Sequence, residues 1–154
     1  VGGGADSQYR WCRKGLGLKL LLASHGPLAR AMRETLQLFC GEDPRVKVLC
    51  AYVDEDTMDV NELIDFWDRS RDPADQWIVI TDVYGGSVNN AFMERLGDDS
   101  LRLIAGMSLP LVLEVFSKLS TLDDAELAAL VSSVRQKGTC LCSLPNSVEE
   151  DEDF

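Results

Sequence analysis

Short apolar runs alternate with amphipathic segments from residue 18 onward, and this alternation leaves few fold classes open to the chain. The apolar runs cover residues 20–23, 46–53, 77–81 and 101–106. Each is short and almost continuously apolar, which is typical of strands that are buried on both faces. Strands separated by helices predict βαβ units, so we expect one α/β domain with a mainly parallel sheet and helices on both faces.

The segments between these runs show helical periodicity. Apolar side chains recur three or four positions apart from Leu28 to Phe39 and again from Val60 to Trp67. Residues 88–91 open a further predicted helix, and two more are predicted over residues 110–118 and 123–137. In the last of these, Thr121 and Asp124 are predicted to form a capping box. The apolar face of this helix is predicted to contain Leu127, Leu130, Val131 and Val134.

The two ends of the chain differ in composition from the domain between them. Residues 1–17 are rich in glycine and basic side chains and are predicted to be a leader or an irregular extension. Residues 18–145 form the predicted domain, and residues 146–154 are predicted to be an acidic, disordered tail. Residues 139–144, which follow Gly138, are predicted to add one more strand before Pro145 stops it.

Charge and cysteine content exclude several classes of function. The formal net charge of −11 argues against a nucleic-acid binder, which needs positive charge to displace counterions from phosphates. No run approaches the roughly 20 apolar residues of a membrane span. Five cysteines without paired CxxC spacing predict reduced thiols and a cytoplasmic location. With a single histidine, the chain lacks a metal-ligand spacing, and we expect neither a metal nor a cofactor.

The turn after the first predicted strand contains the only histidine of the chain, His25. Right-handed crossovers place the carboxyl ends of parallel strands along one edge of the sheet, where open α/β sheets bind ligands. Gly26 permits a close approach or an unusual backbone conformation beside the imidazole. His25 is therefore a candidate nucleophile, and a histidine that only caps a helix is the alternative.

The turn after the strand at residues 77–81 supplies complementary groups. Asp82 ends that strand and reaches His25 if the two strands are neighbours, so its carboxylate could accept Nδ1–H and leave Nε2 as the nucleophile. Ser87 is a candidate N-cap, and the Gly85 and Gly86 backbone could bring N–H groups to an anion. Together the two turns favour a phosphoryl site over a hydrolytic triad, for which Ser24 lies beside His25 but no GxSxG elbow is present.

These turns resemble the mannose-type enzyme IIA of the bacterial sugar phosphotransferase system. The resemblance runs from residue 18 to residue 145 and is carried by LLLASHG at 20–26, DVYGGS at 82–87 followed by Asn90 and Ala91, and IAGMSLP at 104–110. It implies that His25 takes a phosphoryl group from the histidine phosphocarrier protein and passes it to a IIB component for sugar uptake. It also implies that Asp82 orients His25, that Ser87 lies near the phosphoryl group, and that the final strand is exchanged in a homodimer.

Three other functions compete with this interpretation. A regulatory domain could keep the fold and be phosphorylated on His25 without passing the group on. The phosphocarrier subunit of a dihydroxyacetone kinase also uses an early histidine. A small-ligand binding module of the same fold class would not need His25.

Overall fold

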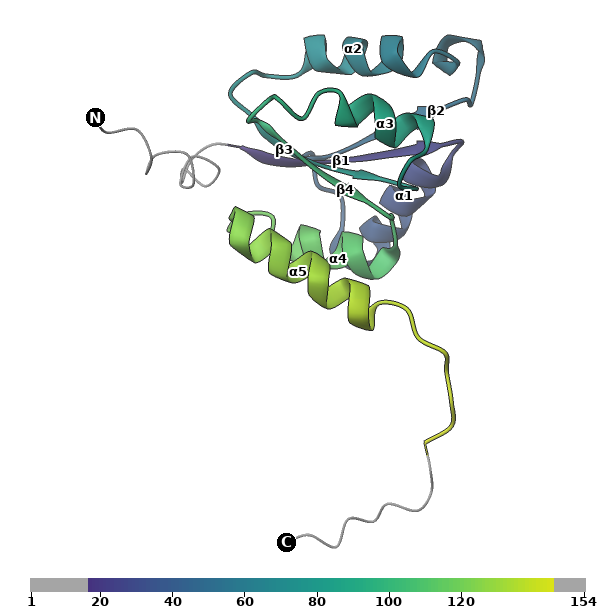
Figure 1. Cartoon of the computed structure of the whole chain (residues 1–154), viewed down its shortest axis with the longest axis vertical. Coiled ribbons are helices and arrows are strands. Elements are labelled where there is room, and N and C mark those ends of the chain that lie inside the picture. Colours follow the sequence, from purple (N-terminus) through teal and green to yellow (C-terminus); the bar gives the residue numbers. More distant parts are fainter. Residues whose placement is uncertain (1–16, 146–154) are drawn as a thin grey trace, which may run out of the picture.

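The computed structural model describes residues 17–145, which form three layers with a parallel sheet between two layers of helices (Figure 1). The strands are β1 (Leu18–His25), β2 (Val46–Ala51), β3 (Gln76–Thr81) and β4 (Leu101–Ala105). The helices are α1 (Leu28–Cys40), the 3₁₀ turn η1 (Glu55–Thr57), α2 (Val60–Ser70), α3 (Ser87–Met93), α4 (Leu109–Ser117) and α5 (Asp124–Lys137). The predicted α/β class with a parallel sheet is confirmed.

The strands lie in the order β2-β1-β3-β4, and every neighbouring pair is parallel. In Figure 1, α2 and α3 cover one face of the sheet, and α1, α4 and α5 cover the other. Strand side chains point alternately to the two faces, so Leu20 and Leu22 join the core under α1 and α4 whereas Leu21 and Ala23 join the core under α2 and α3. Burial on both faces explains the continuous apolar runs of the sequence.

Two predicted helix caps are wrong. Gly86 is the N-cap of α3 and Ser87 is the first helical residue, so Ser87 does not cap this helix. The capping box of α5 pairs Asp123 with Glu126, because Asp123 is three residues before Glu126 and each side chain accepts the other's backbone N–H. Thr121 donates its hydroxyl to the carbonyl of Lys118 instead.

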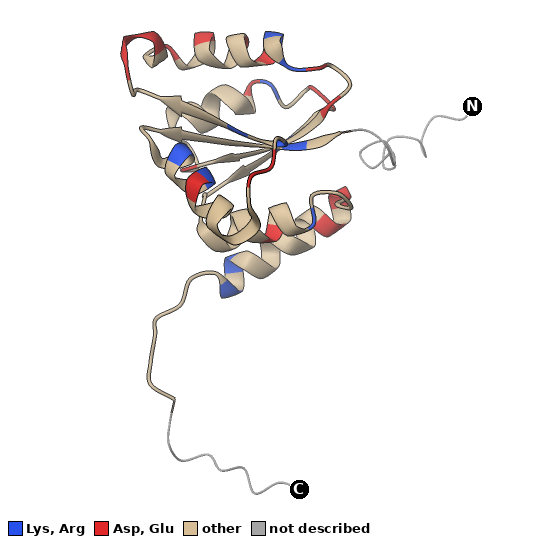
Figure 2. Ribbon diagram, turned by 180° about the vertical axis from the view of Figure 1, so that it is seen from behind, with Lys and Arg blue, Asp and Glu red and all other residues tan. Residues whose placement is uncertain are grey.

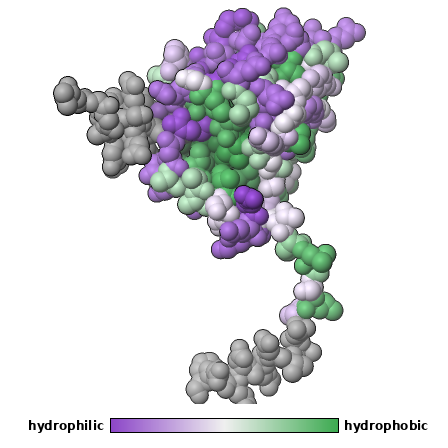
Figure 3. Space-filling view, viewed as in Figure 1, coloured by the Kyte–Doolittle hydropathy of each residue, from purple (hydrophilic) through white to green (hydrophobic). Residues whose placement is uncertain are grey.

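The strand predicted at residues 139–144 is absent from this single chain. After α5 the backbone leaves the domain, and Leu141 and Leu144 are 100% and 90% exposed. The apolar side chains of this extension lie outside the compact body in Figure 3. A fold-back of residues 139–144 onto the chain's own sheet, the alternative to subunit exchange, is also not observed. Exchange of this segment with a second subunit stays a prediction. The predicted leader and acidic tail lie outside the described residues, apart from Gly17.

Candidate functional site

His25 and Asp82 lie side by side at the switch point of the sheet. From β1 the chain crosses to β2 on one side of β1 and then to β3 on its other side. The loops that follow the carboxyl ends of β1 and β3 therefore run in opposite directions. The register pairs Ala23 with Thr81, which brings the end of β1 next to the residue after β3. The predicted neighbourhood of the two turns is therefore present.

One carboxylate oxygen of Asp82 binds both the backbone and the ring of His25. Asp82 Oδ2 accepts the His25 backbone N–H at 2.9 Å and lies 2.8 Å from the ring Nδ1. Partial burial raises the pKa of Asp82, but the hydrogen bonds from the His25 backbone and ring, the His25 charge and the Val83 N–H outweigh it, so the pKa is lowered. Asp82 therefore remains a carboxylate, which accepts a hydrogen bond from Nδ1–H and leaves the lone pair of the neutral ring on Nε2.

The other ring nitrogen faces hydroxyl groups. His25 Nε2 lies 3.0 Å from Ser87 Oγ, and Ser87 Oγ lies 2.9 Å from the Tyr52 hydroxyl. The rings of His25 and Tyr52 stack, with centroids 5.5 Å apart and planes inclined by 21°. The His25 side chain is 36% exposed, against 11% for Asp82, so a reactant can approach Nε2 while the orienting carboxylate is sheltered.

Tyr52 is a site residue that the sequence analysis missed. The strand predicted over residues 46–53 ends at Ala51, and Tyr52 follows it with a positive φ of 62°. The sequence signal that could have identified Tyr52 was its position directly after a strand, at the same edge of the sheet as His25. The turn of the backbone that brings its ring over the imidazole depends on tertiary contacts and has no signature in the sequence.

Glycine stands at two positions of these turns where another residue would collide or be strained. A Cβ on Gly86 would lie 3.0 Å from His25 Cε1 and 2.8 Å from Val83 Cγ1, so a side chain there would collide with the ring or its support. Gly26 has a φ of 61°, a conformation that other residues adopt with strain. The unusual backbone conformation predicted at Gly26 is present, whereas the predicted binding of an anion by the Gly86 N–H stays a prediction.

Neighbouring side chains hold the turns in place. Ser24 is buried, and its hydroxyl accepts the Ala29 N–H at 2.8 Å and donates to the Gly26 carbonyl. In the second turn, the N–H groups of Gly85 and Gly86 donate to Asn89 Oδ1 and to the Val83 carbonyl, both at 3.3 Å. These amides stabilise the turn in this structure, and the side chain within hydrogen-bond distance of Nε2 is that of Ser87.

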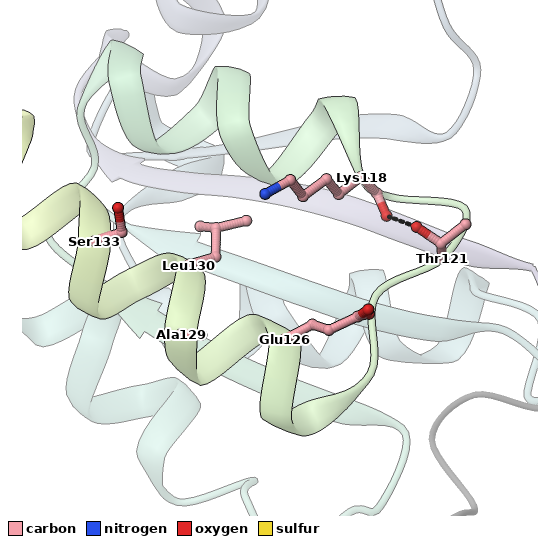
Figure 4. A pocket seen from close by; sticks show the side chains of 6 residues that line it. All are labelled: Lys118, Thr121, Glu126, Ala129, Leu130 and Ser133. Atoms are coloured by element: carbon pink, nitrogen blue, oxygen red, sulfur yellow. Dashed lines mark hydrogen bonds between the residues drawn. The ribbon is translucent and has the colours of Figure 1, made fainter.

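A pocket of about 430 Å³ lies elsewhere, between α4 and α5 (Figure 4). It is lined by Lys118, Thr121, Glu126, Ala129, Leu130 and Ser133. None of the predicted site residues belongs to this lining. Among residues 17–145, no group of three or more histidine, cysteine or acidic side chains is placed to hold a metal ion. In the same part of the chain, no helix is both long and apolar enough to cross a membrane.

Fold and site together define an open parallel α/β protein with an oriented, accessible histidine at its switch point. The model of the family described as "PTS system fructose IIA component" matches residues 19–134. The chain belongs to this family of IIA components of the sugar phosphotransferase system, and the resemblance seen in the sequence is confirmed.

Individual relatives agree with this family. The sorbose-specific EIIA component of Klebsiella pneumoniae is 26% identical over 136 residues, which cover 85% of this chain and 96% of the relative. A phosphotransferase-system permease structure from the same species, described as putative, matches with a TM-score of 0.75 and 27% identity over 84% of this chain and 94% of that one. The mannose/sorbose-specific IIA subunit of Enterococcus faecalis gives a TM-score of 0.64 at 25% identity, covering 84% and 97%.

Proposed function

We propose that this IIA component carries a phosphoryl group on Nε2 of His25, received from the histidine phosphocarrier protein and passed to a IIB component. The observation that carries the proposal is the placement of His25 between two fixed partners, with Asp82 on Nδ1 and Ser87 on Nε2. Orientation by a carboxylate is what an imidazole nucleophile needs, because it fixes which nitrogen holds the lone pair.

The transfer step follows from this geometry. The Nε2 lone pair attacks the phosphorus of the donor's phosphohistidine, the new N–P bond forms as the donor's N–P bond breaks, and the released electron pair stays on the donor nitrogen. The His25 ring becomes more positive as it bonds to phosphorus, and the Asp82 carboxylate stabilises that charge through Nδ1–H. Onward transfer to IIB is the same reaction in reverse, so neither step requires a proton to leave His25.

The surface around the site suits a basic partner. Asp54, Glu55 and Asp56 are exposed in the segment that follows Tyr52, close to the carboxyl edge of the sheet. Figure 2 marks further acidic residues along the ribbon of α2. Val83, exposed on the turn after β3, adds apolar area at the same edge of the sheet. Complementary charge accelerates encounter, so we expect association with a basic phosphocarrier to weaken as salt is added.

Reconstitution tests the proposal. The chain is incubated with phosphoenolpyruvate, the phosphocarrier and its kinase, and its intact mass is then measured. We expect one phosphoryl group that is lost in mild acid, no gain in His25→Ala, and loss of the group when a IIB protein is added. A His25→Ala protein that gains the same mass would overturn the assignment of the acceptor. A phosphorylated chain that no IIB protein can discharge would favour the regulatory alternative.

A further inference from the structure

We propose that Tyr52 is a positioning residue of the phosphoryl-transfer site and that it acts through Ser87. Its hydroxyl sets the direction of the Ser87 hydroxyl, and its ring holds the plane of the His25 imidazole. The inference rests on the proposed function, because it assigns a role within that reaction.

The hydrogen-bond chain has only one consistent direction when the ring is neutral. Nδ1–H donates to Asp82, so Nε2 has no proton and can only accept a hydrogen bond. Ser87 must therefore donate its single hydroxyl proton to Nε2. Its oxygen then meets the Tyr52 hydroxyl as an acceptor, so the chain runs from Tyr52 through Ser87 to His25.

This direction of the hydrogen bonds prepares the site for the negatively charged phosphoryl oxygens. When the Nε2 lone pair becomes the N–P bond, the Ser87 hydroxyl loses its acceptor and is left beside the phosphoryl oxygens. Because Tyr52 occupies an acceptor position of Ser87 Oγ, the Ser87 proton stays directed toward the incoming group. A donor that is oriented in advance stabilises the transferring phosphoryl group without reorganising during the reaction.

The backbone at Tyr52 supports a dedicated role. A φ of 62° is strained for an aromatic residue and persists only where the surroundings fix it. The Tyr52 N–H donates to the Thr57 carbonyl at 2.9 Å, and the N–H groups of Val53 and Asp54 both donate to Thr57 Oγ1 at 3.0 Å. The η1 turn thus holds Tyr52 with its ring against His25, where its hydroxyl reaches Ser87.

Tyr84 offers a matched control. It lies on the turn after β3, at the same edge of the sheet, but its side chain is 80% exposed, whereas Tyr52 is 39% exposed and stacked on His25. Tyr52→Phe removes the hydroxyl and keeps the stacked ring, and Tyr84→Phe removes an equivalent hydroxyl away from the hydrogen-bond chain. The pair therefore separates positioning from the loss of any tyrosine hydroxyl.

The first test uses phosphoramidate as the phosphoryl donor, because a small donor eliminates effects on protein docking. Rate constants for phosphorylation of His25 are measured by intact mass for the wild type, Tyr52→Phe, Ser87→Ala, the double variant and Tyr84→Phe. We expect Tyr52→Phe to be about 3–10-fold slower, as for loss of one hydrogen bond, and Tyr84→Phe to match the wild type. We also expect Tyr52→Phe to cause no further loss in the Ser87→Ala background. Equal slowing in both backgrounds, or none in either, would overturn the inference.

The second test needs no phosphorylation. Nitrogen NMR of the His25 ring, recorded at a pH where the spectrum itself shows the neutral imidazole, reports hydrogen bonding at each ring nitrogen separately. We expect Tyr52→Phe to shift the Nε2 resonance and leave the Nδ1 resonance unchanged, with no Nε2 shift in the Ser87→Ala background. An unchanged Nε2 resonance would overturn the role of Tyr52. A wild-type chain that takes no phosphoryl group on His25 would instead contradict the proposed function, while these spectra still decide whether Tyr52 acts on Nε2 through Ser87.

Discussion

The carboxylate of Asp82 holds His25 at two points, with Oδ2 accepting the backbone N–H at 2.9 Å and lying 2.8 Å from the ring Nδ1. The two residues are 57 positions apart in the sequence and meet because β1 and β3 are adjacent and in register. One oxygen thus fixes both the turn that carries the histidine and the tautomer of its ring. The pairing of β1 with β3 therefore places the carboxylate that binds the ring of His25.

Asp82→Asn should slow phosphoryl transfer at least about tenfold while the protein stays folded. The amide oxygen of asparagine can still accept one hydrogen bond, but it supplies no negative charge to stabilise the more positive ring of phosphorylated His25. Rapid-quench measurement of phosphorylation by the phosphocarrier checks this expectation. Asp99→Asn, an exposed aspartate in the loop before β4, is the control and should transfer at the wild-type rate. A normal rate in Asp82→Asn would show that the observed contact does not contribute to transfer.

Gly86→Ala should impair transfer through steric displacement of His25. The added Cβ would lie 3.0 Å from His25 Cε1, and moving the ring weakens its bonds to Asp82 and Ser87. We expect a loss of about tenfold or more in rate, since small displacements of a reacting group are costly. Gly97→Ala is the matched control, because an added Cβ there meets nothing within 4 Å. Equal rates in the two variants would contradict the steric role of Gly86.

The order of strands and helices along the chain could be predicted because it depends on local sequence patterns. Buried parallel strands need apolar side chains on both faces, and their helices need one apolar face, so the pattern predicted β1 to β4 within a few residues. Helix caps are harder to predict, because several neighbouring polar residues could each bind the first N–H groups of the helix. Ser87 was assigned to the cap of α3, but its hydroxyl instead reaches His25, and Gly86 takes the cap position.

The site was only partly visible in the sequence. His25 and Asp82 stand at strand ends, where polar groups are conspicuous after apolar runs. Tyr52 reads as the continuation of an apolar strand, because tyrosine is common in strands and its positive φ follows from the contacts of η1. Identifying Tyr52, the second hydroxyl-bearing residue of the site after Ser87, therefore required the tertiary structure.

An ion-pair cluster before the amino ends of β3 and β4, at the opposite edge of the sheet from His25, should make stability depend on pH. The Arg71 side chain is 8% exposed, lies over the Trp67 ring and pairs with Asp68 at 2.6 Å and Asp98 at 2.7 Å. Burial raises the pKa of Asp98, but hydrogen bonds from Ser100 and the hydrogen bond and charge of Arg71 outweigh it, so the pKa is lowered. A carboxylate with a lowered pKa in the folded state stabilises the protein above its unfolded pKa, about 3.9.

Asp98→Asn should therefore lower the free energy of unfolding at pH 7 by about 0.5–1 kcal/mol, a range reduced for solvent screening of this partly exposed group. The difference from the wild type should shrink as the pH falls from about 4 through the lowered pKa of Asp98, because the wild-type carboxylate then becomes neutral. Urea unfolding at a series of pH values measures it. A difference that stays constant down to about pH 2 would assign the effect to packing instead of charge.

The C-terminal extension and the edge of the sheet suggest how two chains could associate. Within residues 17–145, β4 has a paired strand on one side only, β3, so no described strand covers its outer edge. Figure 3 shows an apolar surface on the face where Figure 1 places β4. Leu141 and Leu144, exposed beyond α5, are apolar side chains without cover. An extension that pairs with the open edge of a second chain would cover both surfaces.

We therefore expect the 154-residue chain to be a dimer in which residues 139–144 of each subunit add a strand to the partner's sheet. Such an exchange is symmetric and closed, so assembly should stop at two chains. Light scattering behind a sizing column distinguishes this mass from that of one chain, 17.0 kDa. Truncation after Gly138 should give a monomer or an aggregate, because it removes the covering strand. Truncation after Pro145 leaves that strand in place and should leave the dimer unchanged. A chain that runs as a monomer at micromolar concentration would reject the exchange, and so would a dimer that survives truncation after Gly138.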